Sequence, residues 1–245
     1  MFKHLARLVI CILFTAHASQ AADKLNIVCT IGMIGNLVEE VGGDHVTVKT
    51  IMNSGVDPHL YKATRSDIVL LSQADIVFYN GLFLEGKMSD ALIRVAASGK
   101  KVFAVTELLD DEYLLEPEEF QGHFDPHVWM DPQAWSKAVA LIRDKLIDAD
   151  PDNKEIYAKN ARNYIDRLRK LDAYAIKTLS SIPKSSRVLV TAHDAFNYFG
   201  RRFEFEVIGI QGLSTDSEAG SKRCRKIVKL LVDRKISALL SYISG

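Results

Sequence analysis

The chain has 245 residues, of which 48% are hydrophobic and 25% are charged, as is usual for a globular protein with one large domain or two modest ones. Its 31 basic and 31 acidic residues balance one another. This balance excludes a general electrostatic attraction to nucleic acid or to an anionic membrane, so we expect no nucleic-acid partner.

The first residues have the three parts of a secretory signal. Lys3 and Arg7 form a basic start, Leu8–Ala16 is an apolar run, and Ala18-Ser19-Gln20-Ala21 is a small-residue cleavage site. The apolar run is too short to span a bilayer. We therefore expect residues 1–21 to be a signal peptide cleaved near Ala21-Ala22, and the mature protein to be periplasmic.

A lipid anchor on Cys11 is the alternative for this segment. The sequence Leu8-Val9-Ile10-Cys11 faintly resembles a lipobox, but Ile10 stands where that motif has a small residue, and Cys11 comes early. We therefore expect an exported protein without a lipid anchor.

The next part of the chain alternates strands with helices. Thr64, followed by Asp67 three residues later, is a typical helix start. Regular β–α alternation indicates a parallel sheet with helices on both faces. The predicted strands are Leu25–Ile31, His45–Ile51, Ile76–Tyr79 and Lys101–Val105, and the predicted helices are Gly32–Val41, one that begins at Thr64, Met88–Ala97 and Pro132–Asp148.

Asn153–Ser180 is the longest periodic segment of the chain, with apolar residues at helical spacing. A helix of about 28 residues is about 42 Å long, more than most globular domains need. We interpret it as a rigid rod that joins two lobes.

Beyond this helix the alternation restarts and then stops early. The predicted elements are a strand at Arg187–Ala192, a helix at Ala195–Tyr198, a strand at Phe205–Ile210, a helix at Glu218–Arg234 and a strand at Ile236–Leu240. The predicted fold class is therefore α/β, with two lobes of parallel sheet joined by one long rigid helix and an incomplete second lobe. The expected domains are an N-terminal lobe over residues 22–150, the linking helix over 151–183 and a truncated C-terminal lobe over 184–245.

Three histidines stand in contexts that suit metal binding. The tripeptide Asp-Pro-His occurs at Asp57-Pro58-His59 and again at Asp125-Pro126-His127, and His193 closes an apolar run. Proline stiffens the backbone before each of the first two histidines, and the aspartate can hold a ring N–H. All three follow strands or precede helices at the sheet edge where ligands bind in open parallel sheets. We expect His59, His127 and His193 to bind one divalent metal ion, and we expect no catalytic residues.

An exported zinc-dependent hydrolase is the alternative that uses the same histidines. A catalytic zinc needs an open coordination position and a nearby general base. Asp57 and Asp125 could serve as bases, although orienting the adjacent imidazoles explains them more simply. The basic stretch from Lys222 to Lys235 is interpreted as the solvated face of a helix.

Six segments of the chain together form a recognisable pattern. They are Thr30-Ile31-Gly32-Met33-Ile34, Gly55–Tyr61, Tyr79-Asn80-Gly81-Leu82, Phe124–Trp129, Arg187–Phe196 and Gly209–Gly212 with Ser214-Thr215. In these segments the chain resembles the TroA/ZnuA-type zinc and manganese solute-binding proteins of ABC importers, and the resemblance covers about residues 25–240. It implies two α/β lobes bridged by a long helix, with Zn²⁺ or Mn²⁺ as the transported ligand between them and His59, His127 and His193 as its first three ligands.

The resemblance also implies an ABC-type metal permease in the inner membrane as partner, and we expect the receptor itself to be a monomer. It implies a fourth ligand, usually an aspartate, beyond the strand expected near Ile236. This chain ends before that position. We therefore expect weak metal binding, and a third possibility is an inactive truncated product of a metal-receptor gene.

Overall fold

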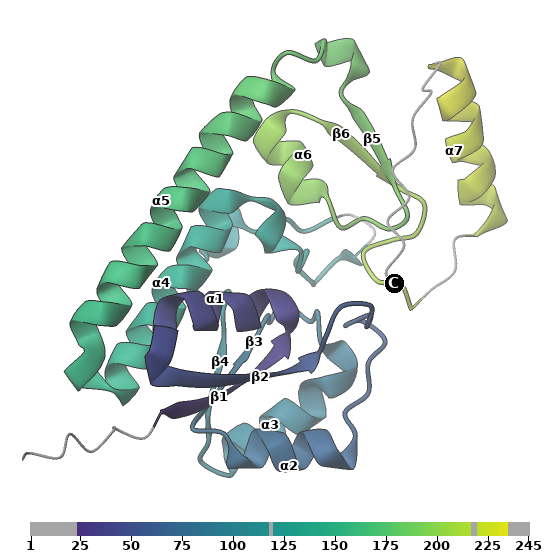
Figure 1. Cartoon of the computed structure of the whole chain (residues 1–245). Coiled ribbons are helices and arrows are strands. Elements are labelled where there is room, and N and C mark those ends of the chain that lie inside the picture. Colours follow the sequence, from purple (N-terminus) through teal and green to yellow (C-terminus); the bar gives the residue numbers. More distant parts are fainter. Residues whose placement is uncertain (1–23, 118–119, 217–219, 235–245) are drawn as a thin grey trace, which may run out of the picture.

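The structure, a computed structural model, describes residues 24–117, 120–216 and 220–234. It contains two β-sheets, each built of parallel strands, and one sheet lies at each end of a long helix (Figure 1). The α/β fold with two lobes and one linking helix, predicted from the sequence, is confirmed. Among the described residues, no helix combines the length and the apolar character that crossing a membrane requires.

The sheet of the first lobe has four parallel strands in the order β2-β1-β3-β4. Strand β1 is one of the two central strands, and its residues Ile27, Val28 and Cys29 are fully buried, because helices cover both faces of the sheet. The four strands are β1 (Leu25–Ile31), β2 (Val46–Met52), β3 (Ile76–Tyr79) and β4 (Lys101–Ala104).

Helices α1 and α4 lie on one face of this sheet, and α2 and α3 lie on the other (Figure 1). The predicted start of α2 is confirmed: Thr64 and Asp67 form a reciprocal capping box that satisfies two otherwise unpaired backbone N–H groups. The bounds are α1 (Gly32–Gly42), α2 (Arg65–Gln73), α3 (Ser89–Ala97) and α4 (Pro132–Ala149). Short 3₁₀ turns occupy Gly43–His45, Gly86–Met88, Asp111–Tyr113, Val128–Met130, Pro151–Asn153 and Lys184–Ser186.

The linking helix α5 (Lys154–Leu179) has 26 residues and runs from the first lobe to the second (Figure 1). Its first half packs on α1 and α4 and buries Tyr157 and Ala161, whereas Tyr174 in its second half is 67% exposed. The helix is therefore anchored in the first lobe. In the second lobe it is held by an ion pair between Asp172 and Arg202.

The second lobe contains β5 (Val188–Thr191) and β6 (Glu206–Gly209), which are parallel, with α6 (Asn197–Phe203) and α7 (Ser221–Asp233). The prediction of a helix at Ala195–Tyr198 was wrong in position. The chain from Ala192 to Phe196 is instead an irregular turn, in which the Thr191 hydroxyl and the Ala195 N–H both donate to the His193 carbonyl. The strand predicted at Ile236–Leu240 lies outside the described residues.

Candidate metal centre

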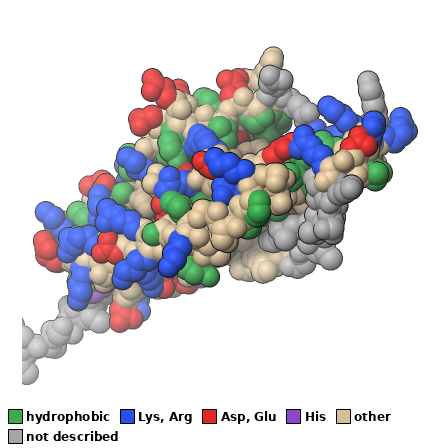
Figure 2. All heavy atoms as spheres, turned by 90° about the horizontal axis from the view of Figure 1, so that it is seen from above, with side chains coloured by type: hydrophobic (Ala, Val, Ile, Leu, Met, Phe, Trp, Pro, Cys, Tyr) green, Lys and Arg blue, Asp and Glu red, His purple; other side chains and the backbone are tan. Residues whose placement is uncertain are grey.

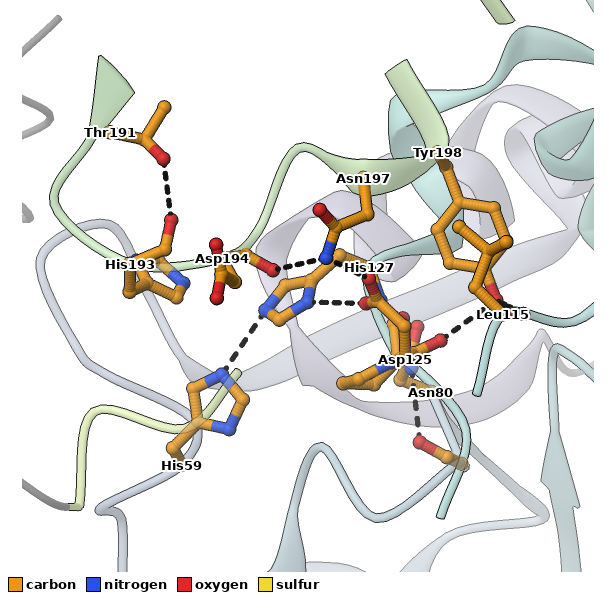
Figure 3. Close-up of polar contacts among 12 residues, drawn as sticks. His59, Asn80, Leu115, Asp125, His127, Thr191, His193, Asp194, Asn197 and Tyr198 are labelled. Carbon is orange, nitrogen blue, oxygen red and sulfur yellow. Dashed lines mark hydrogen bonds and ion pairs between the residues drawn. The ribbon is translucent and has the colours of Figure 1, made fainter. Parts of the chain in front are cut away.

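The three predicted histidines lie together between the lobes (Figure 3). One ring nitrogen from each of His59, His127 and His193 lies within 4.8 Å of the others. His59 follows β2, His127 precedes a 3₁₀ turn at Val128–Met130, and His193 lies two residues after the end of β5. The parallel sheets thus bring residues that are far apart in sequence to one place, as expected for the carboxyl ends of strands.

The two Asp-Pro-His segments fold into the same turn. In each, the aspartate Oδ1 accepts the backbone N–H of the histidine, at 2.9 Å for Asp57 with His59 and at 2.9 Å for Asp125 with His127. This local hydrogen bond forms a turn in place of regular secondary structure, and the turn fixes the direction in which the histidine side chain projects from the backbone. The repeated tripeptide therefore predicted a repeated local structure.

Asp125 also orients the ring of its histidine. Its Oδ1 lies 2.7 Å from His127 Nδ1, and both residues are buried. Since a carboxylate only accepts, Nδ1 carries the proton and the Nε2 lone pair faces the other histidines. The expectation that the aspartates orient their imidazoles through the ring therefore holds for Asp125, whereas Asp57 acts through the backbone N–H of His59.

The spacing of the nitrogens suits a small cation. His59 Nε2 and His127 Nε2 are 3.2 Å apart. Two nitrogens that each lie about 2.0–2.1 Å from a tetrahedral zinc ion are about 3.3–3.4 Å apart. The pair is therefore already near the separation that zinc coordination requires.

Burial keeps the imidazoles of His59 and His193 neutral. Burial and, to a lesser extent, the neighbouring His127 lower the pKa of His59 to about 4 and that of His193 to about 4. At neutral pH both rings therefore have a free lone pair, which is the form that binds metal.

Sequence reasoning missed a buried polar group that supports the His127 segment. Asn80 Nδ2 donates to the Pro126 carbonyl at 3.0 Å, and the Tyr198 hydroxyl donates to the Asp125 carbonyl at 3.0 Å. Asn80 is itself held by Glu85, whose Oε1 accepts the Asn80 backbone N–H at 2.7 Å, and burial raises the pKa of the Glu85 carboxyl. The polar Asn80 directly after a buried strand was the one signal of this network in the sequence.

Gly209 is a position where a methyl group should disturb the site. A Cβ there would lie 2.1 Å from Asp194 Oδ1 and 2.7 Å from the Asp194 backbone nitrogen, next to His193. We expect Gly209→Ala to cost about 1–3 kcal/mol of stability, because the contact is partly with backbone, and also to weaken metal binding by displacing His193. Thermal unfolding and a zinc titration measure the two effects. Gly212→Ala, where a Cβ meets nothing within 4 Å, is the matched control. Equal behaviour of the two variants would contradict this expectation.

Comparisons with known proteins agree with the fold. The family profile of the zinc-uptake complex component A, periplasmic, matches residues 27–242. The chain is 42% identical over 226 residues to the manganese-binding lipoprotein MntA of Bacillus subtilis, which covers 92% of this chain and 73% of that protein. It is 40% identical over 226 residues to the zinc-binding protein TroA of Treponema pallidum, covering 92% of this chain and 72% of TroA.

The solved structure of the periplasmic zinc-binding protein TroA from Treponema pallidum superposes with a TM-score of 0.87, covering 91% of this chain and 79% of that one. These similarities favour a metal receptor over the zinc-dependent hydrolase. Since several relatives are named lipoproteins, the expectation of no lipid anchor is not borne out. The chain belongs to the ZnuA family of zinc-uptake complex component A, periplasmic.

Proposed function

We propose that His59, His127 and His193 hold the metal ion that this chain captures outside the cytoplasm, and that the chain delivers Zn²⁺ or Mn²⁺ to an ABC-type permease in the inner membrane. The observation that carries this proposal is the set of three ring nitrogens within 4.8 Å, contributed by both lobes. Neutral imidazoles are ligands that zinc and manganese accept. The names of MntA and TroA refer to manganese and zinc respectively, which supports either metal as the cargo.

The geometry favours reversible binding of the ion over catalysis. A hydrolytic zinc site needs a carboxylate or imidazole that is available to take a proton from bound water. Both Asp57 and Asp125 already accept hydrogen bonds on each carboxylate oxygen. We therefore propose a binding protein and not an enzyme.

We propose that the receptor acts as a monomer outside the cytoplasm, and that it needs no nucleic-acid partner. On the face seen from above in Figure 2, lysine and arginine side chains are interspersed with aspartate and glutamate. A mixed surface of this kind produces no field of a single sign. We also propose lobes over residues 22–150 and 184–245 with the linking helix over 151–183.

A titration of the full chain with Zn²⁺ and with Mn²⁺ tests the proposal. The Trp129 ring lies 5.3 Å from the His127 ring, so its fluorescence reports binding at the site. We expect one equivalent of metal per chain, and no turnover of ester or amide substrates by the loaded protein. An absence of binding at micromolar metal would support the inactive product, and turnover that depends on zinc would support the hydrolase.

A further inference from the structure

The second lobe contacts both aspartates of the Asp-Pro-His segments, which belong to the first lobe. Asn197 Nδ2 donates to Asp125 Oδ2 at 3.0 Å, and Thr215 Oγ1 donates to Asp57 Oδ2 at 2.6 Å. The other carboxylate oxygen of each aspartate, Oδ1, holds its own histidine. Each carboxylate therefore bridges one side chain of the second lobe to one histidine of the first (Figure 3 shows the Asp125 bridge).

The same two side chains are also connected to the segment that carries the third histidine, His193. Asn197 Nδ2 lies 3.3 Å from the carbonyl of Asp194, the residue after His193. Thr215 lies in the loop after β6, three residues beyond Gly212, whose carbonyl accepts the Asp194 backbone N–H at 3.2 Å. The segment that carries His193 thus connects through Asn197 to His127, and through Thr215 to His59.

These bonds have the chemistry of strong orienting contacts. Hydrogen bonds to an ionised carboxylate are shorter and stronger than bonds between neutral groups. Asp125 is fully buried and Asn197 is half-buried, so loss of the amide would leave a carboxylate oxygen without its partner and away from water. The ion pair between Lys87 and Asp216, next to Thr215, is partly exposed and contributes little by comparison.

We propose that Asn197 and Thr215 are positioning residues that couple the approach of the two lobes to the orientation of His127 and His59 respectively. This proposal rests on the proposed function and adds that ligand geometry depends on two donors from the opposite lobe. The two contacts are separable, because each donor binds a different aspartate. Removing one should disturb one histidine and leave the other in place.

The test uses the full chain with Asn197→Asp and Thr215→Val. Asn197→Asp keeps the shape of the side chain but replaces the donor with an acceptor, and Thr215→Val removes only the hydroxyl. Partners that orient metal ligands typically contribute about 10–100-fold in affinity, so we expect zinc binding to weaken by that factor in each variant. Thr215→Ser, which keeps the hydroxyl, should bind within about threefold of the parent by the same reasoning.

Nitrogen NMR of the metal-free protein measures the ring signals of each histidine. A purely structural role of Asn197 or Thr215 would not change the signals of one histidine selectively. Asn197→Asp should alter the His127 ring signals and leave those of His59 unchanged, and Thr215→Val should do the reverse. Asn160→Ala is the control, because that amide donates to the Val41 carbonyl between α5 and the first lobe, outside the site. If Asn197→Asp unfolds the protein, Asn197→Ala replaces it.

Affinities within twofold of the parent in both variants, or imidazole signals that change together, would overturn the proposal. Since the NMR measurement needs no metal, it separates this proposal from the proposed function. If the parent binds no metal but the selective changes appear, only the proposed function fails.

Discussion

Replacing His127 with alanine should weaken zinc binding by roughly a hundredfold or more. Apparent zinc-binding energies of four-ligand protein sites are about 10–16 kcal/mol, or about 3 kcal/mol per ligand, which corresponds to about two orders of magnitude in Kd. His127 is the best oriented of the three, because Asp125 fixes its tautomer and its Nε2 lies 3.2 Å from that of His59. Competition titration against a zinc indicator dye measures the loss.

The control for this variant is His123→Ala. His123 is an exposed histidine whose ring lies 5.3 Å from that of Phe83, outside the cluster of three. It should bind zinc like the parent. Because His127→Ala also leaves Asp125 without its ring partner, His127→Gln provides a second variant that keeps an amide donor. An affinity of either His127 variant within threefold of the parent would remove His127 from the ligand set.

Without metal, the protein should lose stability as the pH falls from about 6.5 to about 4. The pKa of His59 and that of His193 are each lowered to about 4 by burial and by the neighbouring His127. In the unfolded chain each pKa is about 6.5, so the unfolded state binds more protons in this window and stability rises with pH. Each histidine can change the free energy of unfolding by at most about 1.4 kcal/mol per pH unit. Partial exposure of the ring to solvent makes this slope smaller.

Urea unfolding between pH 4 and pH 7 in the presence of a chelator measures this slope. Glu85 acts in the opposite direction, because burial raises its pKa and its protonation in the folded state favours stability at low pH. The histidine contribution is therefore taken as the difference between the parent and a variant with both His59→Gln and His193→Gln. We expect that variant to show a clearly shallower pH dependence. Equal slopes in the two proteins would show that these imidazoles do not have lowered pKa values.

Most of the fold could be predicted because its signals are local. Strand β1 at Leu25–Ile31 and strand β3 at Ile76–Tyr79 have the predicted bounds, since each is a short apolar run that ends at a recognisable breaker or helix start. The turn before α6 could not be predicted, because its hydrogen bonds replace helical ones in a sequence that otherwise suits a helix.

In the site, too, some residues could be identified from local sequence signals and others could not. The three histidines could be found because proline and aspartate precede two of them and a buried strand precedes the third. The second-lobe partners of the two aspartates could not, since Asn197 lies 72 residues from Asp125 and Thr215 lies 158 residues from Asp57. No periodicity or motif connects such pairs, and only the packing of the two lobes brings them together.

X-ray absorption spectroscopy at the zinc edge of the loaded full chain tests the metal centre most directly. We expect a first shell of nitrogen and oxygen scatterers at about 2.0–2.1 Å, with the outer-shell pattern of three imidazoles that falls to two in His127→Ala. A shell of sulfur at about 2.3 Å, or an imidazole count that His127→Ala leaves unchanged, would contradict a site built from His59, His127 and His193.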